Sequence, residues 1–109
     1  MNNMLIMTKK TERFLLLYGM YRKANGNPYY VSNAKEIANQ EGMNYRAFKS
    51  AFDYLCREKL ISPETYSLDS AEYYYQASLT DEGVRAIEWV FDDENQDTKY
   101  FPAYRRMMV

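Results

Sequence analysis

The first run of apolar residues along the chain predicts a helix that has no polar side. Thr8 is suited to be its N-cap and Gly26 to stop it, and between them Phe14 to Tyr21 is apolar all round. A helix on the surface of a protein would show a polar stripe. We therefore expect this helix to be covered on both sides, on one side by its own domain and on the other by a second subunit.

Three more helices follow from caps and apolar spacing. Asn33 with Glu36 forms a capping box, and Asn44 caps the next helix. That helix turns one side to the core, with apolar residues at helical spacing: Phe48, Ala51, Phe52, Leu55, Cys56 and Leu60. The last helix, capped by Thr80, runs to Phe91.

Alternation of polar and apolar residues predicts strands between these helices. Residues 65–68 and 73–79 form a hairpin around a polar turn at residues 69–72, and Tyr29-Tyr30-Val31 forms another short strand. The fold class is α+β, mainly α, in the order helix, strand, helix, helix, strand, strand, helix. We expect one domain over residues 8–91, a flexible N-terminus at 1–7, and an acidic linker with a C-terminal tail at 92–109.

A small residue, a glycine and a large apolar residue mark the two central helices. Ala38 leaves room where the helices cross, Gly42 can adopt the positive φ that ends the first helix, and Phe48 closes the contact. This spacing resembles the helix-turn-helix of DNA-binding proteins. The closing Leu79-Thr-Asp-Glu-Gly83 is similar to the Leu-Thr-x-x-Gly that follows the wing in MarR-like and PadR-like bacterial regulators. The chain thus resembles a winged helix-turn-helix domain.

The resemblance implies a recognition helix and a dimer. Those families bind double-stranded DNA, repress transcription and join their subunits through terminal helices. It implies that the wing tip is residues 69–72 and that the groove-facing residues are Asn44, Tyr45, Arg46, Lys49 and Ser50. Scattered charges on a helix are more often a solvated surface, and this alternative stays open for Arg46 and Lys49.

The overall charge is −1, but its distribution along the chain favours the N-terminal half as the part that DNA would approach. Residues 8–24 carry a net charge of +4, and residues 62–97 carry −9. We expect Lys9, Lys10 and Arg13 to add phosphate contacts. The acidic groups around the wing would repel phosphate, and because winged helices also serve as protein-binding modules, the fold does not settle the function.

The expected dimer interface combines the first and last helices. Its predicted residues are Phe14, Leu17, Tyr18, Gly19, Tyr21 and Trp89. A pocket near Trp89 for a small-molecule effector is a further hypothesis, and plain packing of each side chain is the alternative. Tyrosines such as Tyr74 can stack on unpaired bases, but burial in the sheet explains most of them.

Little in the sequence supports catalysis. The chain has no histidine, which removes the commonest general base, and its one cysteine, Cys56, falls on the buried side of its helix. No metal site or cofactor motif is found, so we expect neither a metal nor a cofactor. No apolar run is long enough to span a membrane and no signal peptide is evident, so we expect a cytoplasmic protein.

These observations favour a sequence-specific DNA-binding protein, a small dimeric transcriptional regulator from a bacterium or phage. The alternative is a winged-helix module for protein–protein interaction, or a phage or plasmid accessory factor, without DNA binding.

Overall fold

The computed structural model describes residues 3–64 and 75–108. Within these ranges the chain forms five helices and one three-stranded antiparallel sheet, so the mainly-α α+β class is confirmed. The first seven elements follow the predicted order. The elements are α1 Asn3–Lys23, β1 Ser32–Asn33, α2 Ala34–Gln40, α3 Tyr45–Arg57, β2 Ile61–Pro63, β3 Gln76–Leu79, α4 Asp81–Asp92 and α5 Tyr104–Met107.

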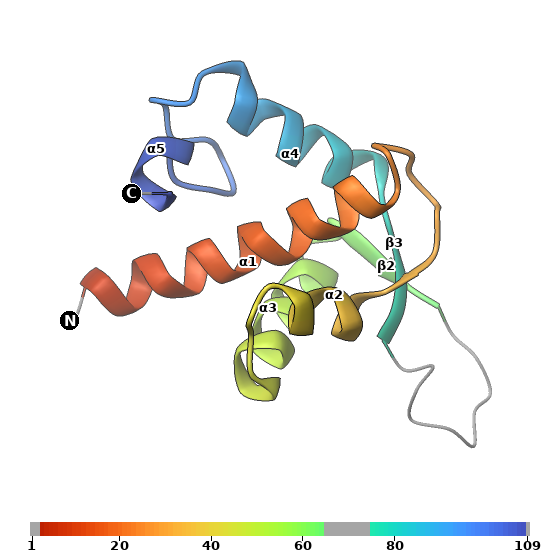
Figure 1. Cartoon of the computed structure of the whole chain (residues 1–109). Helices are drawn as coiled ribbons and strands as arrows, with labels where there is room; N and C mark the ends of the chain where they lie inside the picture. The colour runs from red at the N-terminus through yellow and green to blue at the C-terminus, as the bar shows by residue number, and fades with distance from the viewer. Residues whose placement is uncertain (1–2, 65–74, 109) are drawn as a thin grey trace.

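Helix α1 lies at the centre of the molecule. Figure 1 shows α4 and α5 on one side of it and α2 and α3 on the other. Phe14, Leu16 and Leu17 of α1 are fully buried. The predicted cover on both sides is therefore present, but both covers come from the same chain.

The start of α1 was predicted wrongly. The helix begins at Asn3, so residues 4–7, which were expected to belong to a flexible N-terminus, form its first turn together with Asn3. Thr8 does not cap the helix, because its hydroxyl donates to the carbonyl oxygen of Met4 at 2.9 Å, one turn earlier. The predicted stop holds: Gly26 has a φ of 73° and donates its N–H to the carbonyl of Tyr21 at 2.9 Å.

The sheet has the order β1-β3-β2. Ser32 pairs with Ala77, and Ile61 pairs with Leu79. The predicted strand at residues 29–31 is wrong, because Tyr29 has a φ of 72°, which interrupts extended backbone, and the strand starts at Ser32. Most of the predicted hairpin, including its turn at residues 69–72 and Tyr74, lies outside the described residues.

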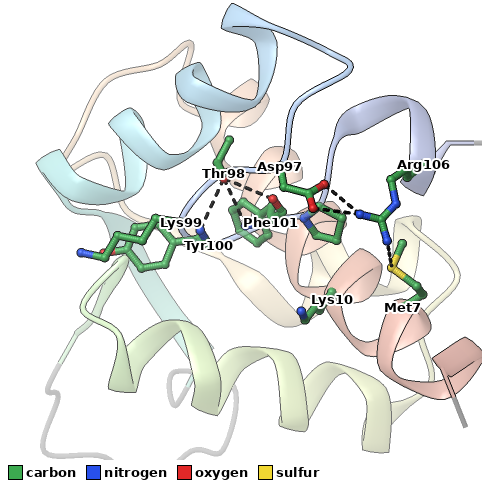
Figure 2. Close-up of a pocket in the computed structure, with 9 residues that line it drawn as sticks. Met7, Lys10, Asp97, Thr98, Lys99, Tyr100, Phe101 and Arg106 are labelled. Atoms are coloured by element: carbon green, nitrogen blue, oxygen red, sulfur yellow. Dashed lines mark hydrogen bonds and ion pairs between the residues drawn. The ribbon is translucent and has the colours of Figure 1, made fainter.

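The C-terminal segment is packed against the core. Phe101 and Ala103 are 2% and 1% exposed, and the ring of Phe101 lies edge-on to that of Phe14 at 5.5 Å. Asp97 accepts the N–H of Ala103 at 2.8 Å and pairs with Arg106 (Figure 2). The bond from Ala103, assisted by Arg106, holds the pKa of Asp97 below its usual range. Residues 97–107, expected as part of a linker and tail, therefore cover α1.

No helix in the described part of the chain is long and apolar enough to cross a membrane.

Candidate nucleic-acid interface

The predicted N-caps of α2 and α3 and the predicted glycine turn between these helices are confirmed. Asn33 accepts the N–H of Glu36 at 3.1 Å, and Asn44 accepts the N–H of Ala47 at 2.8 Å. Gly42 has a φ of 79°, and the residue after it, Met43, donates its N–H to the carbonyl of Ala38 at 3.0 Å. This closure turns the chain sharply from α2 into α3.

The contact between the two helices forms as its spacing predicts. Ala38 is fully buried, and Ile37 and Phe48 are 6% and 1% exposed. Phe48, Ala51, Phe52 and Leu55 turn one side of α3 to the core. The opposite side of the helix is consequently held rigidly toward solvent.

The predicted groove-facing residues lie along this outer side. Asn44, Tyr45, Arg46 and Ser50 are exposed, and Lys49 is partly exposed. Lys49 donates to Asp53 one turn later at 2.7 Å, and this bond raises the pKa of the lysine. Arg46 forms no ion pair with any described residue. Among the described residues, Arg46 is therefore an unpaired cation on this surface, while Lys49 is partly neutralised.

Tyr45 is held in place by Tyr75, the residue just before β3. Its hydroxyl lies 2.7 Å from that of Tyr75, and the ring of Tyr75 packs edge-on against Phe48 at 4.9 Å. The bond to Tyr45, with burial, raises the pKa of Tyr75 to about 12. The ammonium of Lys35 lies 5.6 Å from the centre of the Tyr45 ring. A fixed aromatic side chain with a cation beside it thus stands at the start of α3.

The structure separates the three cations predicted on the first helix. Lys9 and Lys10 are exposed, but Lys10 lines a cavity of about 190 Å³ together with Asp97 and Arg106 (Figure 2). The guanidinium of Arg13 instead stacks on the ring of Tyr54 of α3 at 3.9 Å. Arg13 thus lies next to α3, whereas Lys10 of α1 faces the C-terminal segment.

Tyr54 was not predicted from the sequence to be part of this surface. Arg57 also approaches its ring, at 5.9 Å, so Tyr54 gathers two guanidinium groups at the end of α3. In the sequence, Tyr54 lies next to Leu55 and therefore at the edge of the apolar side of α3. This position did not indicate a contact with a residue of another helix. The Nε of Arg13 is buried and has no hydrogen-bond partner among the described residues.

The predicted dimer residues fall into two groups. Phe14, Leu17 and Gly19 are buried inside the single chain. A Cβ at Gly19 would lie 2.6 Å from the Cγ2 of Ile37, so this glycine serves the contact of α1 with α2. Tyr18 and Tyr21 are half-buried, and Trp89 is 38% exposed. The need for a second subunit that was inferred from α1 is thus met by the chain itself.

Other kinds of site have little basis in the described residues. No group of His, Cys, Asp or Glu side chains within residues 3–64 and 75–108 could hold a metal ion. Burial raises the pKa of the half-buried Cys56 to about 11, so its thiol is protonated at neutral pH. Comparison of this chain with protein-family models, with curated proteins and with solved structures finds no match in any of the three.

Proposed function

We propose that this chain is a winged-helix DNA-binding protein that regulates transcription, with α3 entering the major groove. The order of elements, the β1-β3-β2 sheet and the glycine turn before α3 support this reading. The observation that carries it is the outer side of α3: a helix fixed by its core contacts presents Arg46 and Ser50 to solvent next to its N-terminus. In helix-turn-helix proteins this part of the second helix contacts base edges.

The structure explains the residues of the Leu-Thr-x-x-Gly sequence at 79–83, and their roles agree with the proposal. Thr80 caps α4 by accepting the N–H of Gly83 at 3.1 Å, and its hydroxyl donates to the carbonyl of Lys59 at 2.6 Å. Gly83 meets the carbonyl oxygen of Leu60 where a Cβ would not fit. The motif therefore joins α4 to the chain that connects α3 with the sheet.

A guanidinium can donate two hydrogen bonds to a guanine, and hydroxyls bond either to bases or to phosphates. We assign Arg46 to base contact and Ser50 and Lys49 to the groove or its phosphates. Arg13 and Arg57 supply positive charge beside the same helix, and the exposed Lys9 lies one turn before Arg13 on α1. Lys10 is not needed for this surface, because it faces the C-terminal segment.

Replacing Arg46 and Lys49 together by alanine is expected to weaken binding to a selected duplex roughly 100-fold and, through the loss of Lys49, to reduce the salt dependence by about one counterion. The measurement is fluorescence anisotropy at rising salt, after selection of a binding sequence from a pool of random duplexes. Asp53→Asn should instead strengthen binding several-fold, because it frees Lys49 and removes a carboxylate that repels phosphate.

Arg85→Ala is the matched control. Arg85 is an exposed arginine on α4, across α1 from α3, and it pairs with Glu82 at 2.9 Å (Figure 1). Its loss should leave affinity unchanged. Equal binding by the double variant and the wild type would show that α3 is not the recognition surface.

We also propose that the protein is a homodimer, as regulators that read pseudo-palindromes are, with half-sites about 34–36 Å apart. The exposed Trp89 of α4 supports an apolar contact there. Sedimentation should give a dimer for the wild type and a monomer for Trp89→Glu. A monomer at all concentrations would limit the protein to a single half-site.

A second candidate is a protein-interaction module with the same fold. It is favoured by the Lys49–Asp53 pair, which weakens the cationic character of α3, and by the exposed Tyr29, Tyr30 and Val31. This reading predicts no affinity for any duplex even at low salt, and no effect of Asp53→Asn.

A further inference from the structure

Residues of α1 and α4 line an open groove. Figure 1 shows α4 on the opposite side of α1 from α3. Its volume is about 470 Å³, which is within the range of small-molecule sites. The lining residues are Tyr18 and Tyr21 of α1 and Ile87, Glu88, Phe91 and Asp92 of α4. Three of the six are aromatic, two are carboxylates and none is basic.

The two carboxylates are set in this groove without a cation to balance them. Glu88 accepts a hydrogen bond from the hydroxyl of Tyr21 at 3.0 Å, which fixes it against α1 and, with burial, raises the pKa of Tyr21. Within residues 3–64 and 75–108, neither Glu88 nor Asp92 forms an ion pair. The groove is therefore negatively charged.

The position of these acids on α4 is unfavourable for the helix itself. Glu88 and Asp92 are four residues apart, so their like charges face each other on adjacent turns. They also lie at the C-terminal end of α4, where free carbonyl groups add partial negative charge, and the last turn contains no basic residue. A cation in the groove would offset all three sources of negative charge.

The aromatic rings give the groove a preference among cations. Phe91 is 36% exposed, and its ring centre lies 5.2 Å from that of Tyr18. The guanidinium of Arg22 already lies over Tyr18 at 4.7 Å and is held there by Glu41 at 2.6 Å. Contact with a ligand therefore falls mainly to Phe91 and Tyr21. Rings of this kind attract alkylammonium groups, whereas a bare metal ion would need more oxygen ligands.

We propose that this groove binds a small organic cation, an amine or a quaternary ammonium compound, through Glu88, Asp92 and the rings of Tyr21 and Phe91. The site is separate from α3 and does not depend on the proposed DNA binding. A ligand here would contact both α1 and α4.

Choline is a suitable probe, because 3,3-dimethylbutan-1-ol has the same shape without the charge. Calorimetric titration at low salt should give at least about tenfold tighter binding of choline than of the alcohol. Amide NMR shifts should centre on Tyr21, Glu88, Phe91 and Asp92. Glu88→Gln and Asp92→Asn should each weaken choline binding several-fold.

Glu58→Gln is the control. It makes the same change of charge at the end of α3, outside the groove. It should leave choline binding unchanged. Asp92→Asn should also raise the melting temperature by about 2 °C in the absence of choline, because it removes the repulsion within α4.

Equal binding of choline and the alcohol, or no binding of choline at millimolar concentration, would overturn the proposal. So would NMR shifts centred away from the groove. If the Asp92→Asn variant were stabilised but still bound choline like the wild type, the Asp92 carboxylate would not be part of the site, and the proposal would equally be overturned.

Discussion

Gly83→Ala is expected to lower the free energy of unfolding by about 3 kcal/mol, a large part of the stability of a domain of this size. A methyl group at this position would overlap the carbonyl oxygen of Leu60 and lie 3.4 Å from the Cδ2 of Leu79. The clash is with backbone, which cannot rotate away as a flexible side chain can. Either α4 or the segment before β2 has to shift.

The measurement is urea denaturation followed by circular dichroism. Gly42→Ala is the matched control, because nothing lies within 4 Å of its added methyl group and only its positive φ opposes the change. It should cost about 1 kcal/mol. Equal losses for the two variants would show that α4 does not approach Leu60 as closely as described.

Phe101→Ala is expected to cost about 3–5 kcal/mol, which is the usual loss for a buried phenylalanine. Phe101 is 2% exposed and lies against Phe14, whose ring also contacts Tyr104 at 5.9 Å. Removal of the ring leaves a cavity between α1 and the C-terminal segment. Thermal unfolding measures the loss.

Phe91→Ala provides the comparison for this second variant. Phe91 is the same residue type but 36% exposed, so its loss should cost about 1 kcal/mol. If Phe101→Ala were no more harmful than Phe91→Ala, the C-terminal segment would not be part of the core in solution.

Local signals in the sequence placed α2, α3 and α4 and the turn before α3. Asn33 and Asn44 are caps whose bonding partners lie three residues away, and Gly42 needs only a positive φ. Interactions of this range are encoded by neighbouring residues, so a single sequence reveals them. The outer side of α3 followed in the same way from helical spacing.

The sequence failed where long-range contacts decide the structure. The pairing of Arg13 with Tyr54 and of Tyr45 with Tyr75 joins residues 41 and 30 positions apart, and no local pattern marks either pair. The covering of α1 was recognised, but not that Phe101 and α4 supply it. A second subunit was expected for this reason, although the C-terminal segment fills that position.

The return of the C-terminal segment to α1 also brings α5 back to the start of α1. Arg106 donates a weak hydrogen bond to the sulfur of Met7 at 3.8 Å, and the start of α1 and α5 lie on the same side of the molecule (Figure 1). A short peptide link could therefore join them, and the exposed turn around Asn25 and Asn27 offers a place to open the chain. In such a circularly permuted protein the central helix would be synthesised last.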